Sequence, residues 1–174
     1  MKGVWLEDLT SSEARGRFDR GDAVVIPVAS AGSQGADLPL GAGAMIARAL
    51  GQRLIERLPV VVAPIVSFGG QWIQAETFRQ ILCEVVDAFR AQGVTRVVLL
   101  EAGLSTERRL EGPSGGLVLR VQDVPGGLID RLRSASAGVG DPSHATACKG
   151  ERLLAAWSDA LAAMLTAEWP QLDA

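Results

Sequence analysis

Histidine and cysteine are scarce in this sequence, and their scarcity limits the chemistry that it supports. Among 174 residues there are one histidine, His144, and two cysteines, Cys83 and Cys148. A single imidazole excludes His-rich metal sites and most histidine-based catalytic triads. The two cysteines do not form a Cys-x-x-Cys motif, so the sequence indicates neither a disulfide framework nor a zinc knuckle.

Blocks of basic residues and long apolar runs are also missing. Seventeen basic residues are balanced by twenty acidic ones, which gives a formal net charge of −3. Without a basic block, binding to nucleic acid through its phosphates is not expected. No segment approaches about 18 uninterrupted apolar residues, and the first ten residues lack the apolar core of a signal peptide. We therefore expect a soluble, cytoplasmic protein with no membrane span.

The sequence does contain enough apolar residues for a well-filled core. Hydrophobic residues make up 48% of the chain and charged residues 21%. A composition of this kind excludes intrinsic disorder. A length of 174 residues suits one domain and is too short for two ordinary ones. We expect a single domain over residues 1–174.

Apolar runs alternate with amphipathic segments along the chain. Continuous apolarity predicts strands that are buried on both faces. The expected strands are 23–28, 60–65, 97–100 and 117–121. The first expected helix is short and begins at a capping box, Thr10 to Glu13. Further helices are expected at 44–57, 76–92, 128–133 and 145–168. This order predicts an α/β fold in which helices cover both faces of a mostly parallel sheet.

Three loops are expected to share one edge of that sheet. They follow the first three expected strands and span Ala29–Gly43, Ser67–Ile73 and Ala102–Gly116. Right-handed crossovers place such loops at the carboxyl ends of the strands. Ligands bind at that edge in open α/β sheets, so we expect any functional site to lie there.

Four segments of the chain carry a family pattern. Residues 28–41 read Val-Ala-Ser-Ala-Gly-Ser-Gln-Gly-Ala-Asp-Leu-Pro-Leu-Gly, and three further segments, 4–10, 96–100 and 140–154, follow in the same order as in the family. Together they resemble the creatininase (creatinine amidohydrolase) family, which typically has Gly-Ser-Thr-Glu-Gln-His-Gly-Pro-His-Leu-Pro-Leu-Gly-Thr-Asp in the first loop. The resemblance extends over most of the chain and implies a three-layer creatininase-like fold.

The metal ligands of that family are replaced here. Creatininase-type enzymes use a metal pair, held by Glu, His and Asp, to activate water on a cyclic amide or a related C–N bond. The resemblance places Gly32 and Gln34 at a Glu and a His position of the first loop, and Gly43 at the Asp position. In the third loop it places Leu104 at a His position and Glu107 at an Asn position. Because Gly and Leu offer no ligand atom, we predict that the creatininase-type metal centre is absent, and we expect no cofactor.

Polar residues that remain near the three loops are candidates for a different site. Glu101 closes an apolar run at a position where the family typically has an apolar residue, and such a carboxylate is usually either paired or functional. With Asp37 and Gln34 it forms our candidate catalytic set, since two neighbouring carboxylates can divide acid and base roles. The alternative is that Asp37 caps a turn and Glu107 pairs with a neighbouring arginine on the surface. The candidate ligand-binding residues are Ser30, Ser33, Trp72 and Glu107.

Three functions are compatible with these observations. We favour a non-hydrolytic structural or regulatory subunit of a homo-oligomer, or of a hetero-oligomer with a related chain, because creatininase-type proteins are commonly hexamers. The alternative is a repurposed, metal-independent enzyme that catalyses an acid/base cyclisation, dehydration or isomerisation of a small molecule. An amidohydrolase acting on cyclic amide C–N bonds, with metal ligands from a neighbouring subunit, is less favoured because the ligand residues are missing.

Overall fold

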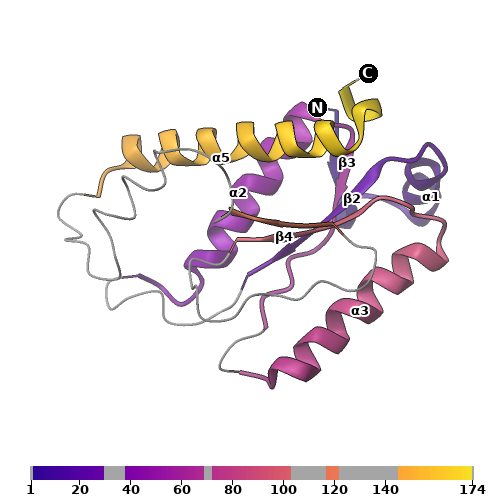
Figure 1. Ribbon diagram of the computed structural model, residues 1–174, viewed down its shortest axis with the longest axis horizontal. Helices are drawn as coiled ribbons and strands as arrows, with labels where there is room; N and C mark the ends of the chain where they lie inside the picture. The colour runs from indigo at the N-terminus through magenta and orange to yellow at the C-terminus, as the bar shows by residue number, and fades with distance from the viewer. Residues whose placement is uncertain (1, 30–37, 69–71, 103–116, 122–144, 174) are drawn as a thin grey trace.

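The computed structural model places five parallel strands in one sheet, in the order β1-β3-β2-β4-β5 (Figure 1). It describes residues 2–29, 38–68, 72–102, 117–121 and 145–173. The strands are β1 (Val4–Trp5), β2 (Ala23–Val28), β3 (Val60–Val62), β4 (Val97–Glu101) and β5 (Leu117–Arg120).

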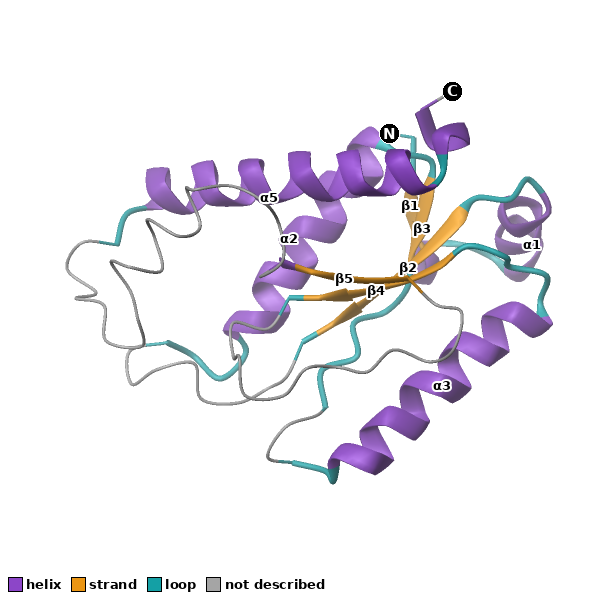
Figure 2. Cartoon of the chain, in the orientation of Figure 1, coloured by secondary structure: helices purple, strands orange, loops and turns teal. Residues whose placement is uncertain are grey.

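Helices cover both faces of this sheet, which confirms the predicted α/β fold (Figure 2). Residues of α2 and α5 pack on one face, and residues of α1 and α3 pack on the other. Among the helices of the described segments, none is both long and apolar enough to cross a lipid bilayer. The helical elements are η1 (Leu6–Asp8), α1 (Ser11–Asp19), α2 (Ala42–Arg57), α3 (Ala75–Ala91), α5 (Ala147–Glu168) and η4 (Pro170–Asp173).

Alternate residues of the central strand supply two separate cores. In β2, Val25 belongs to the core under α2 and α5, whereas Val24 and Ile26 belong to the core under α1 and α3. Successive side chains of a strand point to opposite faces, so a strand that is covered on both faces has to be apolar throughout. All six residues of β2 are buried, which explains the continuous apolar run.

The start of α1 confirms the predicted capping box. The backbone N–H of Glu13 donates to the hydroxyl of Thr10 at 3.4 Å, and the backbone N–H of Thr10 donates to the Glu13 carboxylate at 2.8 Å. Hydrogen bonds from the Thr10 hydroxyl, and then from its backbone N–H, lower the pKa of the Glu13 carboxyl. The helix ends where expected, before Gly21, which adopts a φ of 80°.

One predicted strand is shorter than expected. The pattern predicts a strand over 60–65, but β3 ends at Val62, and Val66 then forms only an isolated bridge. The backbone carbonyl of Pro27 in β2 accepts a hydrogen bond from the N–H of Val66. The backbone of Pro27 therefore faces the side of β2 on which β3 lies. Because Pro27 has no backbone N–H, the regular parallel ladder between β2 and β3 lacks a donor at this point.

Other differences are small. The two residues of β1 are too few to show a periodicity, so the sequence does not predict this strand. The helices expected from 44 and from 145 begin at Ala42 and Ala147. The helix expected at 128–133 lies outside the described residues.

The aromatic ring of Trp5 packs directly on α2. Its indole N–H donates to the side-chain oxygen of Gln52 at 3.2 Å, and the guanidinium carbon of Arg48 lies 4.8 Å from the centroid of its ring. A Cβ atom at Gly51 would lie only 2.7 Å from the Cη2 atom of Trp5. This contact accounts for a glycine in mid-helix, where its low helix propensity is otherwise unfavourable.

Two helical glycines therefore respond differently to an added methyl group. We expect Gly51→Ala to lower the free energy of unfolding by about 1–3 kcal/mol, because the methyl group overpacks the Trp5 contact. Gly150 in α5 has no atom within 4 Å of an added Cβ. We expect Gly150→Ala to raise the free energy of unfolding by roughly 0.5–1 kcal/mol through helix propensity. Urea unfolding of both variants tests this, and effects of the same sign would contradict it.

Candidate functional site

The carboxyl edge of the sheet contains a topological switch point. From β2 the chain passes through α2 to β3 on one side, and from β4 it continues to β5 on the other side. Since β2 and β4 are neighbours, their carboxyl ends flank the point where the connections diverge, which is the usual place for ligand sites in open α/β sheets. The register pairs Val28, the last residue of β2, with Glu101, the last residue of β4.

Glu101 forms an ion pair with Arg120 at this point. The two residues lie opposite each other in the β4–β5 register, and Nε of Arg120 donates to Oε2 of Glu101 at 3.1 Å. The Glu101 side chain is 13% exposed and that of Arg120 is 21% exposed. The pair lies on the face covered by α1 and α3, because Leu99, two residues before Glu101, belongs to that core.

The arginine is a favourable partner for a carboxylate at this position. A guanidinium group at hydrogen-bond distance stabilises the ionised form of a carboxylate. It also offsets the cost of placing a charge at the end of an apolar strand. The sequence leaves open whether Glu101 is paired or functional. The structure shows that it forms an ion pair with Arg120.

The other candidate residues are distributed differently. Trp72 lies in the connection between β3 and α3, and 54% of its surface is exposed. Its role as an apolar wall for a ligand stays a prediction. Five candidates lie outside the described residues, so their proposed roles also stay predictions: Gln34, Asp37, Ser30, Ser33 and Glu107.

Sequence reasoning overlooked Arg120. It stands in an expected strand, next to Leu119 in an otherwise apolar run, just as Glu101 ends the run of β4. Two opposite charges that interrupt two apolar strands are a signal for cross-strand pairing when the strands are neighbours. Strand order and register, which make Glu101 and Arg120 opposite, come only from the structure.

The described part of the chain does not fit the ligand set of a metal pair. Within it, no three side chains of His, Cys, Asp or Glu lie close enough together to hold a metal ion. Gly43, at the position that the resemblance assigns to a ligand Asp, is buried in the first turn of α2 and has no side chain to offer. The other positions that the resemblance compares with the family's loops, Gly32, Gln34, Leu104 and Glu107, lie outside the described residues.

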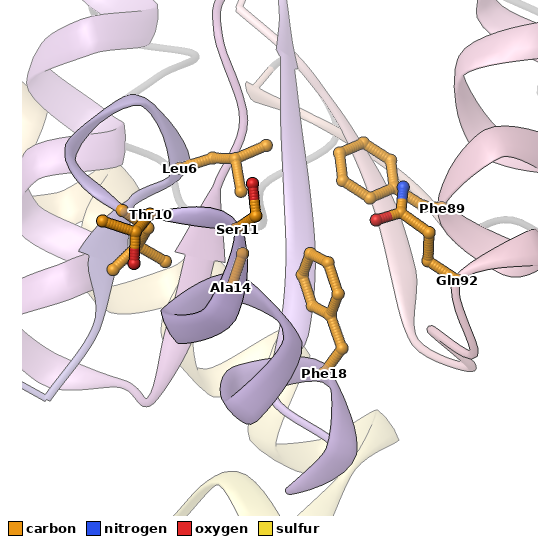
Figure 3. Close-up of a pocket in the computed structure, with 8 residues that line it drawn as sticks. Leu6, Thr10, Ser11, Ala14, Phe18, Phe89 and Gln92 are labelled. Atoms are coloured by element: carbon orange, nitrogen blue, oxygen red, sulfur yellow. The ribbon is translucent and has the colours of Figure 1, made fainter.

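A separate pocket lies between α1 and the end of α3 (Figure 3). Its volume is about 240 Å³, and the rings of Phe18 and Phe89, which line it, meet edge to face at 6.1 Å. No ionisable side chain lines it, so it does not suit acid/base catalysis. The lining residues are Leu6, Leu9, Thr10, Ser11, Ala14, Phe18, Phe89 and Gln92.

The burial of the Glu101–Arg120 pair leads to a testable energetic asymmetry. We expect Arg120→Met alone to lower the free energy of unfolding by about 1–3 kcal/mol, because it leaves a half-buried carboxylate without this partner. The double variant Glu101→Leu with Arg120→Met should recover most of that loss. As a control, Arg79→Met on the exposed ion pair with Glu76 should cost less than about 1 kcal/mol. Urea unfolding measures all three, and additive losses in the double variant would contradict the prediction.

Comparison with known proteins places this fold. Among solved structures, a creatininase described with manganese superposes with a TM-score of 0.78 at 15% identity, over 97% of this chain and 99% of that chain. A creatininase variant complexed with creatine superposes with a TM-score of 0.78 at 14% identity, over 97% of this chain and 99% of that chain. The crystal structure of a creatinine amidohydrolase gives 0.72 at 14% identity, over 98% of this chain and 99% of that chain. No curated protein matches the sequence.

The family is shown by the sequence itself. The model of the creatininase family, described as creatinine amidohydrolase, matches residues 7–103, which is more than half of the chain. The matched region contains β2, β3 and β4 and the helices between them, and so includes the switch point. The chain belongs to the creatininase (creatinine amidohydrolase) family.

Proposed function

We propose that this chain, as a single domain, is a non-hydrolytic member of the creatininase family that acts as a structural or regulatory subunit of an oligomer. The oligomer consists of copies of the chain or includes a related chain. The observation that carries the proposal is that Gly43, which the resemblance places at a ligand Asp position, is buried in the first turn of α2 and has no donor side chain.

The chemistry of metal-assisted hydrolysis supports this reading. A metal pair that activates water needs several oxygen and imidazole ligands close together, with one coordination position left open. A glycine supplies no ligand, and a carboxylate that is paired with a guanidinium is already neutralised. The apolar strands and the helices that cover them are retained, so the fold persists without the residues of the family's reaction.

One observation favours a second candidate function, a metal-independent acid/base enzyme. Glu101 is a half-buried carboxylate at the switch point, where ligands usually bind in this class of fold. Together with Asp37 and Gln34 it would accept and return a proton in a cyclisation, dehydration or isomerisation of a small molecule. General acid/base catalysis contributes typically 10²–10⁴-fold, so the reaction would have to be intrinsically facile.

Native mass spectrometry tests the subunit proposal. We expect protein that is purified from its own host, without chelators, to appear as an oligomer and to carry no stoichiometric metal. We also expect no conversion of creatinine after Mn²⁺ or Zn²⁺ is added, since the ligand residues are missing. Metal bound at a fixed ratio per chain, together with creatinine hydrolysis, would contradict the proposal and restore the amidohydrolase alternative.

Replacing Glu101 separates the two candidate functions. Glu101→Gln keeps the size of the side chain and removes its charge. Under the subunit proposal we expect the mass of the oligomer to stay unchanged. Under the enzyme alternative, a small molecule that co-purifies with the protein identifies the substrate, and its turnover should fall by at least about 100-fold. Glu84→Gln, on the exposed face of α3, is the matched control and should alter neither property.

A further inference from the structure

Three arginines gather around the turn that leads into β2, and we call Arg17, Arg20 and Arg96 the arginine cluster. Arg17 and Arg20 each donate to the same oxygen, Oδ2 of Asp22, at 3.1 and 3.4 Å. The Nη1 atom of Arg96 donates to the backbone carbonyl of Gly21 at 2.8 Å. Because Asp22 immediately precedes β2 and Arg96 immediately precedes β4, the cluster lies at the amino edge of the sheet. It is therefore separate from the switch point, which lies at the carboxyl edge.

The positive charge of the arginine cluster is only partly matched by acidic groups. Every other ion pair of the described residues joins one arginine to one carboxylate. Here two arginines share Asp22, and Arg96 forms no ion pair with a described carboxylate. Asp19, which is exposed at the end of α1, likewise forms no ion pair with the cluster in the described part of the chain. Three guanidinium groups and one carboxylate leave a formal excess of two positive charges, on a chain whose net charge is −3.

The arginine cluster is held in place by the protein and still has donors to offer. Arg17 also donates to the backbone carbonyl of Lys2 at 3.0 Å, and its side chain is 23% exposed. A guanidinium group has five N–H donors, and the contacts of Arg20 and Arg96 with described residues use one in each. Side chains that are fixed before a ligand arrives lose little conformational entropy when they bind it. The cluster is therefore suited to bind an anion.

We propose that the arginine cluster binds the dianionic phosphate group of a small molecule. Guanidinium groups bind phosphate through charge-assisted, often bidentate hydrogen bonds. A dianion matches the excess of two positive charges, whereas a monoanion leaves one of them uncompensated. Nucleic acid fits less well, because the sequence has no basic block that would contact successive phosphates. The inference does not depend on the proposed function, since the cluster lies at the opposite edge of the sheet from Gly43 and Glu101.

Titration of the full chain with inorganic phosphate tests the site, followed by the amide NMR signals of Gly21 and Asp22. The titration is run at constant ionic strength, so that general screening of charges does not change, and above the second pKa of phosphate. We expect saturable shifts of both signals, at least about tenfold weaker binding of acetate, and binding of glycerol 3-phosphate at least as tight as that of inorganic phosphate. Arg96→Met should weaken phosphate binding at least about fivefold. Arg79→Met is the matched control and should leave it unchanged, because Glu76 already matches that guanidinium.

Asp22→Asn distinguishes a ligand site from a cluster that only supports the fold. It removes the carboxylate that competes with phosphate for Arg17 and Arg20, so we expect phosphate to bind at least about threefold more tightly. A purely structural cluster would lose stability in this variant without any gain in phosphate binding. Circular dichroism melting verifies that the variant is folded. If it is not, Arg20→Met takes its place, since that side chain is 62% exposed, and it should weaken binding.

Three results would overturn the phosphate site. One is the absence of a saturable shift in the wild-type chain. The second is a folded Arg96→Met variant that binds phosphate as tightly as the wild type does. The third is a folded Asp22→Asn variant that binds it no more tightly. None of these results changes the oligomer mass or the metal content by which the proposed function is tested, so the two can fail separately.

Discussion

The burial of β2 on both faces is the constraint on which the rest of this structure depends. Its six residues are fully enclosed, with Val25 in one core and Val24 and Ile26 in the other. A strand in this position needs a helix layer on each side, and the chain supplies them by moving from β2 to β3 through α2 and from β3 to β4 through α3. Moving in opposite directions along the sheet with right-handed crossovers puts these helices on opposite faces. The same path separates the connections after β2 and β4, and so creates the switch point at Val28 and Glu101.

The Glu101–Arg120 pair is the place where this apolar framework admits charge. Glu101 is the last residue of β4 and Arg120 the last of β5, so both lie where the strands leave the buried centre of the sheet. A register shift of one residue would turn one of them toward the core under α2 and α5, where no opposite charge faces it in the β4–β5 ladder. The pair thereby favours one register of β5, and it places a carboxylate and a guanidinium at the edge where ligands bind in folds of this class.

Membership of the creatininase family and the proposed loss of its ligand residues are compatible because they depend on different parts of the chain. The fold rests on apolar strands and on helix contacts such as that between Trp5 and Gly51, and these are retained. The resemblance assigns the reaction of the family to a few donor side chains, and Gly43, which it places at one of those positions, lies in a regular first turn of α2.

The sequence by itself determined the elements and their order. Continuous apolar runs such as 97–100 specify buried strands, the Thr10–Glu13 capping box specifies the start of α1, and the alternation of strands and helices specifies a parallel sheet. It also pointed to Glu101 as a carboxylate in an unusual place. Only the tertiary structure decided that β1 joins the sheet, that β3 stops at Val62 beside Pro27, which lacks an N–H group, and that Arg120 is the partner of Glu101. The physical reason is that apolar pattern and local caps depend on neighbours in sequence, whereas strand order and register depend on residues far apart in the chain, whose pairing is fixed only when both cores are packed.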